Sequence, residues 1–461
     1  MSTPERAPMH SSSERTKALR EKVLEYAKGR MELDPAPLDQ PQTLEYLQQV
    51  VPPTITEAGL GGERALELFA EVLAPASLST DHPGYLSFIP TAPTEAATLF
   101  DLVVSASSIY GGSWLEGSGA VYAENEVLSW LAHEFGMPEG AGGVFVQGGT
   151  IGNLSALVAA RDHAKRKLAA ENRQQPPRFA VLCSAEAHSS IKSAAAVMDI
   201  DVIKVPVDSS GRMTAAAVAE TLETSPDGVF ALVATAGTTN FGIVDDLTGI
   251  GSIARERGIW FHVDGAYGLA AALAPSSRHL FEGAALADSA IVDPHKWLFA
   301  PFDACALIYR DPEIARIAHT QHGEYLDTLN KPGEWNPSDY AFNLTRRVRG
   351  LPLWFSLATH GAAAYREAIE ENIALAKRIA KEIESRDYLR LVREPELSIV
   401  VFERNGWALE DYESWGSDLL EKQIGLVLPS SLNGRPHTRF AIVNPRTSFE
   451  LLVEILDTMK P

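Results

Sequence analysis

The chain has 461 residues, 45% of them hydrophobic and 22% charged, which is typical of a folded globular protein and excludes wholesale disorder. The 60 Asp and Glu outnumber the 40 Lys and Arg, and the net charge of −20 disfavours nucleic acid as a partner, because phosphate contacts need a clustered positive field. The N-terminus lacks the apolar core of a signal peptide, and no run of about 18 apolar residues could span a bilayer. We therefore expect a cytoplasmic protein with no membrane partner.

The first hundred residues carry helical patterns. A helix is expected over residues 14–30, followed by a proline-rich extended connector and an amphipathic helix over 62–74. A helix pair is expected at 94–109 and 117–136. This block is too thin to bury a core of its own, so it must pack on the rest of the chain or on a second copy of it.

From residue 143 to 310, short β-branched runs alternate with alanine-rich helices, which predicts an α/β fold with a mostly parallel sheet. The expected strands are 144–146, 179–182, 201–205, 230–234, 260–263, 289–292 and 304–309. The expected helices are 151–170, 189–198, 214–224 and 247–257. Because no helix separates the last two strands, the last one is expected to be antiparallel.

The rest of the chain changes character. Residues 311–345 lack apolar periodicity, and a loop of this length is usually functional. A long helix is then expected, followed by a smaller α+β unit; the elements are helix 352–386, strands 389–393, 398–403 and 439–443, helix 411–422 and a final helix. We therefore predict an N-terminal helical segment over 1–90, a large α/β domain over 91–345 and a small C-terminal domain over 346–461.

The cysteines and histidines give little sign of a metal centre. Cys183 and Cys305 are the only cysteines, and each lies in an apolar stretch typical of a buried core thiol. His262 and Asp264 point to the same face of a strand, but no third ligand is spaced nearby, so we expect no metal.

Two residues at strand ends suggest chemistry. Lys296 follows an apolar strand and is expected to be largely buried, which lowers the pKa of a lysine and makes its amine a nucleophile. Asp264 ends another apolar strand, at the edge where open parallel sheets bind ligands, and a carboxylate there can keep a ring nitrogen protonated. The alternatives are a lysine whose ammonium reaches solvent and an aspartate that caps a turn.

Three further segments fall at the same edge. The glycine-rich run from Gln147 to Asn153 leads from a strand into a helix, where backbone N–H groups can hold an anion. His188 follows the next strand and could lie over a planar ligand or cap a helix, and Thr239 offers a hydroxyl near a third strand end. A phosphate cradle, a stacking imidazole, a buried carboxylate and a nucleophilic lysine are together what pyridoxal phosphate needs.

At this point the sequence resembles the group II pyridoxal-phosphate decarboxylases, the family of the aromatic-L-amino-acid, histidine and glutamate decarboxylases. The resemblance runs from around His82 to Arg446. Its most specific motifs are Asp293-Pro-His-Lys-Trp-Leu, His262-Val-Asp-Gly-Ala-Tyr, Ala187-His-Ser-Ser and Asn444-Pro-Arg-Thr. It implies fold type I of the pyridoxal-phosphate-dependent transferases, with a mostly parallel seven-stranded sheet flanked by helices.

The resemblance also assigns residues to roles. It implies that Lys296 carries pyridoxal 5′-phosphate covalently, that Asp264 pairs with the pyridinium nitrogen and that His188 stacks on the ring. The further cofactor contacts that it implies are Gly149, Thr150, Asp293 and His295 at the phosphate, and Thr239 and Ala266 at the ring. Asp293 stands where animal aromatic decarboxylases carry asparagine.

The remaining implied residues concern the substrate. Tyr325 aligns with the tyrosine of the family's catalytic loop, which is thought to deliver a proton to Cα, and relatives with phenylalanine there tend to be aldehyde synthases. The implied substrate contacts are Tyr85, Phe88, Pro90, Thr91 and Tyr110. Gly112 replaces a bulky aromatic of the animal enzymes, so the pocket has a different shape. The family acts as a homodimer, so we expect a homodimer with the active site at the subunit interface.

The expected reaction is decarboxylation of an L-amino acid, of the tyrosine, tryptophan or phenylalanine type, to the amine and carbon dioxide. An acidic or diamino acid is the alternative substrate. Aldehyde synthesis or carbon–carbon lyase chemistry with the same cofactor is an alternative reaction. A nucleotide-binding oxidoreductase is disfavoured because the G-x-G-x-x-G motif is missing, and a non-catalytic binding scaffold is disfavoured because Lys296 and Asp264 are both present.

Overall fold

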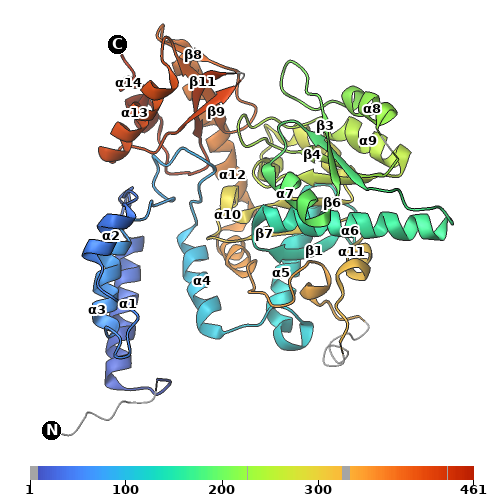
Figure 1. Cartoon of the computed structure of the whole chain (residues 1–461). Helices are drawn as coiled ribbons and strands as arrows, with labels where there is room; N and C mark the ends of the chain where they lie inside the picture. Colours follow the sequence, from blue (N-terminus) through green and yellow to red (C-terminus); the bar gives the residue numbers. More distant parts are fainter. Residues whose placement is uncertain (1–8, 226, 324–332, 433) are drawn as a thin grey trace.

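The computed structural model of the chain describes residues 9–225, 227–323, 333–432 and 434–461. One seven-stranded sheet with the order β1-β7-β6-β5-β4-β2-β3 forms its centre (Figure 1). The strands are β1 (Gly142–Val146), β2 (Ala180–Ser184), β3 (Asp201–Val205), β4 (Val229–Thr235), β5 (Trp260–Asp264), β6 (Ser289–Val292) and β7 (Cys305–Tyr309). Strands β2 to β6 run parallel, whereas β7 runs antiparallel to both β1 and β6. The predicted α/β fold with a mostly parallel sheet is confirmed, and so is the antiparallel last strand.

The central strands are buried on both faces, which explains why they read as nearly continuous apolar runs. Successive side chains of a strand point to opposite faces, so Leu232 and Val233 of β4 enter two different hydrophobic clusters. One cluster lies under α5 (Trp114–Glu134), α8 (Ala215–Thr224), α9 (Leu247–Arg257) and α12 (Leu351–Glu384). The other lies under α6 (Gly148–Ala170), α7 (Ser189–Met198) and α11 (Pro312–His319).

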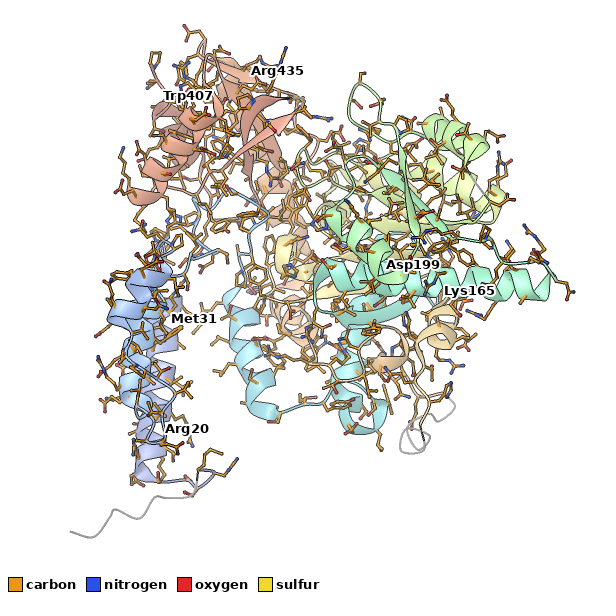
Figure 2. All side chains as sticks on the ribbon, in the orientation of Figure 1. Arg20, Met31, Lys165, Asp199, Trp407 and Arg435 are labelled. Atoms are coloured by element: carbon orange, nitrogen blue, oxygen red, sulfur yellow. The ribbon has the colours of Figure 1, made fainter. Side chains whose placement is uncertain are left out.

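The N-terminal helices stand beside this body. They are α1 (Glu14–Met31), α2 (Leu44–Val50) and α3 (Gly62–Leu68), the last continuing as a π-helical turn over Phe69–Leu73. No residue of α1 is buried, and Figures 1 and 2 show the helix with labelled Arg20 and Met31 standing apart from the sheet. Helix α2 lies in the stretch predicted to be extended, and it forms because the Thr43 hydroxyl accepts a hydrogen bond from the Tyr46 N–H and caps it.

A second, smaller sheet forms the C-terminal part. Its order is β10-β11-β9-β8 and all its pairs are antiparallel. Its elements are β8 (Leu389–Leu391), β9 (Ile399–Arg404), α13 (Leu409–Glu421), β10 (Pro429–Leu432), β11 (Arg435–Ala441) and α14 (Phe449–Asp457). The sequence did not predict β10, because this edge strand, Pro-Ser-Ser-Leu, lacks an apolar pattern.

The segment 311–345, predicted to be one long loop, is partly helical. Helix α11 begins right after Asp311, whose carboxylate accepts a hydrogen bond from the Glu313 N–H, and Pro312 occupies its first turn. Helix α4 (Glu95–Ser107) and α5 match the helix pair predicted at 94–109 and 117–136. Among the described helices, none combines the length and the apolar character needed to cross a membrane.

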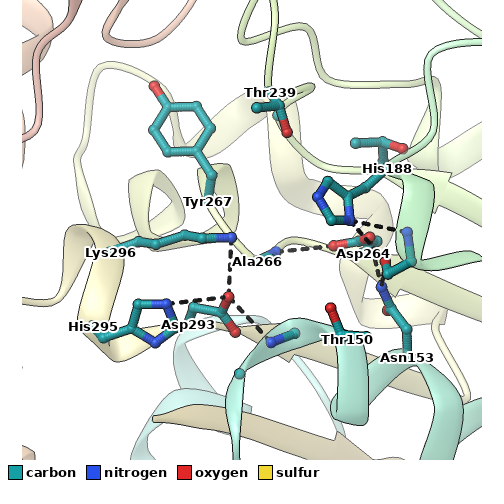
Figure 3. Close-up of a pocket in the computed structure, with 15 residues that line it drawn as sticks. Thr150, Asn153, His188, Thr239, Asp264, Ala266, Tyr267, Asp293, His295 and Lys296 are labelled. Carbon is teal, nitrogen blue, oxygen red and sulfur yellow. Dashed lines mark hydrogen bonds and ion pairs between the residues drawn. The ribbon is translucent and has the colours of Figure 1, made fainter. Parts of the chain in front are cut away.

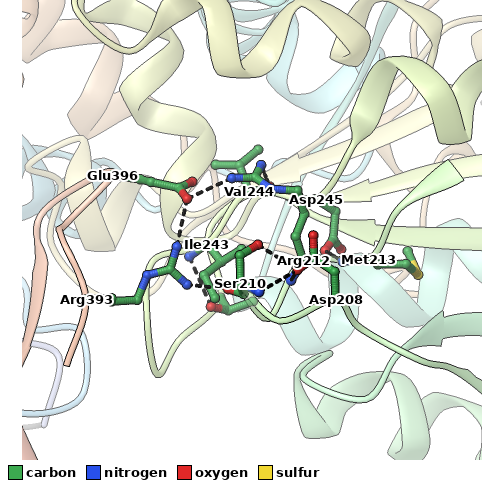
Figure 4. Close-up of polar contacts among 10 residues, drawn as sticks. Asp208, Ser210, Arg212, Met213, Ile243, Val244, Asp245, Arg393 and Glu396 are labelled. Atoms are coloured by element: carbon green, nitrogen blue, oxygen red, sulfur yellow. Dashed lines mark hydrogen bonds and ion pairs between the residues drawn. The ribbon is translucent and has the colours of Figure 1, made fainter. Parts of the chain in front are cut away.

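The two parts are joined by a cluster of charges (Figure 4). Glu396, between β8 and β9, pairs with Arg212 at 2.7 Å and with Arg393 at 2.8 Å. Arg393 also donates to the Ser210 carbonyl at 2.6 Å. The loop that precedes α8 is therefore tied to the C-terminal part, and Arg212 reaches on to the Val244 carbonyl.

Next to this cluster lies a buried carboxylate. Asp245 is 2% exposed, and it accepts hydrogen bonds at 2.8 Å from the backbone N–H groups of Thr235 and Met213. Burial raises the pKa of Asp245 to about 7, although these two hydrogen bonds and the Arg212 charge lower it. The carboxylate thereby fastens the end of β4 to the loop that precedes α8.

The raised pKa of Asp245 predicts how the stability of the fold depends on pH. From its ordinary value of 3.8 up to about pH 7, the folded chain holds a proton on Asp245 that the unfolded chain has released. The free energy of unfolding therefore falls as pH rises through this window, by up to about 1.4 kcal/mol per pH unit from this group. In urea titrations across the window, we expect Asp245→Asn to flatten this slope and Asp246→Asn to keep most of it. An unchanged slope in Asp245→Asn would contradict the assignment.

Candidate functional site

The polar residues singled out from the sequence meet in one pocket at the carboxyl edge of the sheet (Figure 3). Parallel pairing brings this about, because Thr235 at the end of β4 lies opposite Asp264 at the end of β5, and Asp293 follows β6. The pocket measures about 210 Å³ and is lined by Gly148, Gly149, Thr150, Asn153, His188, Ser190, Thr235, Gly237, Thr239, Asp264, Ala266, Tyr267, Asp293, His295 and Lys296. All nine predicted cofactor contacts are among these residues.

One wall is the N-terminus of α6, which begins at Gly148, three residues before the predicted start. Gly148 has a φ of +77°, a conformation that favours glycine. A side chain at Gly149 would lie 3.1 Å from Asp293 Oδ2 and 3.2 Å from the Ala266 Cβ, so glycine keeps this wall open. Exposed N–H groups at a helix N-terminus attract anions.

Lys296 lies opposite, in the short helix α10 (Pro294–Trp297). Its Nζ is 3.0 Å from Asp293 Oδ2, and 23% of its side chain is exposed, within the pocket. Burial lowers the pKa of Lys296, as the sequence predicted, but the Asp293 and Asp264 carboxylates raise it by more, so the net shift is upward. The expectation of a lowered pKa is therefore corrected, because the sequence does not reveal how close Asp293 lies.

His295 completes the group around Asp293. Its Nδ1 lies 2.7 Å from the carbonyl oxygen and 3.2 Å from the backbone N–H of Ala304. Its Nε2 lies 3.8 Å from Asp293 Oδ2. Burial lowers the pKa of His295, which the Asp293 charge partly offsets.

Asp264 is 4% exposed and is held by two donors. The Asn153 Nδ2 donates to its Oδ2 at 2.9 Å, and the Ala266 N–H donates to its Oδ1 at 3.2 Å. His188, the N-cap of α7, lies near this carboxylate in the close-up (Figure 3) and has its Nδ1 2.8 Å from the Ser190 Oγ.

The pocket wall also depends on the C-terminal part of the chain. The Tyr267 ring stacks on Trp297 at 5.2 Å, and its hydroxyl lies 2.6 Å from the Ser398 Oγ. Arg439 of β11 donates to the carbonyl of Thr239. Two of the lining residues, Tyr267 and Thr239, are thus held in place by residues of the C-terminal part.

The residues present fit pyridoxal phosphate. The helix N-terminus and the glycine cradle suit a phosphate, and Lys296 and Asp264 line the same pocket. Two buried oxygens in the lining, Thr235 Oγ1 and Asp293 Oδ1, have no hydrogen-bond partner in the described chain, as expected of a site built to bind a polar ligand.

The predicted substrate contacts lie outside this lining. Tyr85 is 7% exposed and packs with Leu38 and Leu426, whereas Phe88 is 58% exposed with a φ of +54°. The Thr91 hydroxyl donates to the Ala300 carbonyl at 3.0 Å, close in sequence to Lys296, and Pro90 is buried beside it.

Tyr110 and Tyr325 complete the predicted set. The Tyr110 hydroxyl donates to the Leu344 carbonyl at 3.1 Å, and a side chain at Gly112 would collide with the Tyr110 ring. The space beside Gly112, where the animal enzymes carry a bulky aromatic residue, is therefore filled by the Tyr110 ring. Tyr325 lies outside the described residues.

Sequence reasoning did not assign roles to several lining residues, chiefly Asn153, Ser190, Thr235 and Tyr267. The Thr235 hydroxyl could have been found from the sequence, because Thr235 ends the strand that shortly precedes Thr239. Across the described ranges, no three His, Cys, Asp or Glu side chains gather as a metal site would require.

Comparison with known proteins identifies relatives that match most of the chain. Residues 45–405 match the family model described as the pyridoxal-dependent decarboxylase conserved domain. The aromatic-L-amino-acid decarboxylase of Bacillus atrophaeus is 29% identical over 395 residues, covering 82% of this chain and 81% of the relative. The L-2,4-diaminobutyrate decarboxylase of Acinetobacter baumannii is 27% identical over 390 residues, covering 80% and 76%.

Solved structures share the fold. The Oryza sativa TDC with PLP and tryptamine superposes with a TM-score of 0.88 at 23% identity, covering 98% of both chains. The Rhodiola rosea 4-hydroxyphenylacetaldehyde synthase superposes with a TM-score of 0.83 at 22% identity, covering 96% of both. The predicted fold type I is confirmed. The family model covers most of the chain, so this protein belongs to the pyridoxal-phosphate-dependent amino-acid decarboxylases.

Proposed function

We propose that this protein decarboxylates an aromatic L-amino acid to the corresponding amine and carbon dioxide. The observation that carries the proposal is that Lys296, Asp264, His188 and the start of α6 line one pocket. When bound, pyridoxal phosphate supplies a ring that takes up the electrons released as the Cα–carboxylate bond breaks.

Residues of the chain hold the cofactor and move the proton. Lys296 would hold the cofactor covalently through its amine. Asp264 holds the proton on the ring nitrogen, and His188 and Ala266 enclose the ring. The phosphate is held by Gly149, Thr150 and His295, with Asp293 beside them. Thr239 contacts the ring. Tyr325 delivers a proton to Cα after carbon dioxide has left.

The lining of the pocket supports an aromatic rather than an acidic substrate. Among the described residues that line the pocket, Lys296 is the only lysine or arginine, so these residues offer no further cation for a side-chain carboxylate. The Phe302 ring is 53% exposed and lies 5.0 Å from the His295 ring at the pocket, and Phe88 is exposed as well. A diamino acid is the second candidate, because a 27% identical relative is named for one.

The substrate is identified by supplying the cofactor and screening the standard amino acids and 2,4-diaminobutyrate. Carbon dioxide release is measured, and the products are identified by mass spectrometry. We expect release from an aromatic amino acid with the amine as product. Release from diaminobutyrate alone would show that the substrate is a diamino acid and not an aromatic one. An aldehyde as the main product would show that the protein is an aldehyde synthase.

We also propose that the segments 1–90, 91–345 and 346–461 are the domains of the protein. We further propose that the protein acts as a homodimer with the active site at the subunit interface. Exposed apolar side chains on α4 support a dimer, because Leu99, Leu102 and Val103 are 43–47% exposed on one helix face. A face of this kind suits a second copy of the chain. The cytoplasmic location stays a prediction.

The first prediction for the proposed function concerns Lys296. Replacing it with alanine removes the amine that binds the cofactor, so we expect loss of turnover and loss of the visible absorbance of the covalently attached cofactor. Lys204→Ala serves as the control, because its ammonium bonds to the Ser184 carbonyl outside the pocket. Multiple turnover by Lys296→Ala would refute the assignment.

The second prediction concerns Tyr325. Without its hydroxyl, Cα loses its proton donor, and general acids of this kind contribute about 100-fold or more. In Tyr325→Phe we expect amine formation to fall by that factor and the product to shift toward aldehyde, as quantified by mass spectrometry. An unchanged amine rate would remove Tyr325 from this role.

The third prediction concerns the dimer. In sedimentation velocity we expect the wild-type chain to run as a dimer and Leu102→Glu, which places a charge on the apolar face of α4, to run as a monomer. Val197→Glu is the matched control, since Val197 is 74% exposed on α7 and lies outside the face of α4. A monomeric wild type would contradict the proposal.

A further inference from the structure

A single buried amide connects the two residues proposed to hold the cofactor ring. Asn153, on the first turns of α6, is 1% exposed. Its Nδ2 donates to Asp264 Oδ2 at 2.9 Å and to the Ser190 Oγ at 2.9 Å. An NH₂ group has two protons, and both are used here.

The orientation of this amide is fixed by its neighbours. The Asn153 Oδ1 lies 2.8 Å from His262 Nε2. If the amide were reversed, its oxygen would face the Asp264 carboxylate, which offers only acceptors when ionised. The orientation with Nδ2 toward Asp264 is the one that places a donor against each acceptor.

The residues behind Asn153 set the direction of the chain of hydrogen bonds. The Trp260 indole can only donate, and it donates to the Ser289 Oγ at 2.8 Å. The Asn153 Oδ1 can only accept, so the proton of a neutral His262 lies on Nε2 and is donated to Asn153. His262 Nδ1 is then an acceptor, and the Ser289 hydroxyl donates to it at 2.8 Å.

His262 stays neutral in this position. It is fully buried, and burial lowers its pKa to about 4, although the Asp264 charge acts in the opposite direction. The imidazole is therefore a fixed donor to Asn153 at neutral pH.

The second N–H of Asn153 leads to the other ring contact. The Ser190 hydroxyl accepts from Asn153, so its proton is free to point to His188 Nδ1, 2.8 Å away. The Ser190 backbone N–H donates to the same Nδ1 at 3.2 Å. Nδ1 of His188 is thus an acceptor, and the orientation of the imidazole is set from Asn153.

We propose that Asn153, backed by His262, is a positioning residue that aims both the Asp264 carboxylate and, through Ser190, the His188 ring. One amide then fixes an edge and a face of the space that the cofactor ring occupies. A side chain with a full set of partners cannot rotate without breaking several hydrogen bonds, and preorganisation of this kind is what a site needs to hold a ligand in one geometry. The inference rests on the proposed function, because it takes Asp264 and His188 as the ring contacts.

The test measures cofactor binding rather than turnover. Pyridoxal phosphate is titrated into cofactor-free protein to obtain its Kd, and the ¹⁵N NMR signal of ring-labelled cofactor reports the proton on the ring nitrogen. In Asn153→Ala we expect a Kd raised about 10-fold or more, since a hydrogen bond to a charged group is lost, and a ¹⁵N signal shifted toward the unprotonated ring. Asn444→Ala is the matched control, because Asn444 is 2% exposed and bonds to the Asp81 carbonyl.

Variants of His262 test the second half of the proposal. His262→Gln keeps an amide N–H that can donate to Asn153, whereas His262→Leu cannot donate. We expect the glutamine variant to retain the wild-type ¹⁵N signal and the leucine variant to resemble Asn153→Ala. Ser190→Ala removes the hydroxyl between Asn153 and His188 and keeps the backbone N–H that also donates to His188 Nδ1. It provides a further variant if Asn153→Ala does not fold, and we expect it to raise the Kd without moving the ¹⁵N signal.

The outcomes separate this inference from the proposed function. A wild-type Kd and ¹⁵N signal in Asn153→Ala, or an equal loss in Asn444→Ala, would overturn the positioning role while leaving the decarboxylase intact. Equal signals in the two His262 variants would overturn the part assigned to His262. A Kd and ¹⁵N signal unchanged in Ser190→Ala would overturn the connection to His188. Failure of the wild-type chain to bind the cofactor at Lys296 would refute the proposed function itself.

Discussion

The site depends on the parallel pairing of β4, β5 and β6, whose carboxyl ends meet at one edge of the sheet. A register fixed by backbone hydrogen bonds places Thr235 opposite Asp264, and β6 delivers Asp293 and Lys296 next to them. Since all three strands are buried on both faces, this register is set by packing on each side. The reactive groups can therefore be short side chains and still converge, although they come from distant parts of the sequence.

Charge is the second constraint on this edge. Two carboxylates, Asp264 and Asp293, share one small space with a single ammonium, and both are almost fully buried. Asp293 forms an ion pair with Lys296 through Oδ2, while its Oδ1 has no partner among the described residues, and Asp264 accepts hydrogen bonds from an amide and a backbone N–H. Burying charge is costly unless it is paired or hydrogen-bonded, so the two arrangements explain why this density of charge is tolerated.

Much of the fold could be predicted from the sequence, because its signals are local. All seven strands of the large sheet read as short apolar runs, and the site motifs stand at their ends. The residues that were missed depend on distant partners instead. Asn153 contacts Asp264 across 111 residues of sequence, and no property of the glycine-rich run reveals that pairing.

The same reason explains the other differences. The pKa of Lys296 moves upward because the Asp293 carboxylate approaches it, which sequence spacing does not reveal. Helix α2 and strand β10 are short elements with little apolar patterning, and they form through a cap and through pairing with β11. Helix α2 and strand β10 therefore form through contacts with neighbouring residues more than through a pattern in their own sequence.

The hydrogen bonds from Ser398 to Tyr267 and from Arg439 to Thr239 bear on how the chain can be divided. A fragment that ends after α12 would keep every strand of the large sheet and every residue that touches the proposed ring, and yet two lining residues would lose their outer supports. The smaller sheet is thus part of the scaffold of the pocket, and any chimera that exchanges it for that of a relative must carry matching partners for Tyr267 and Thr239.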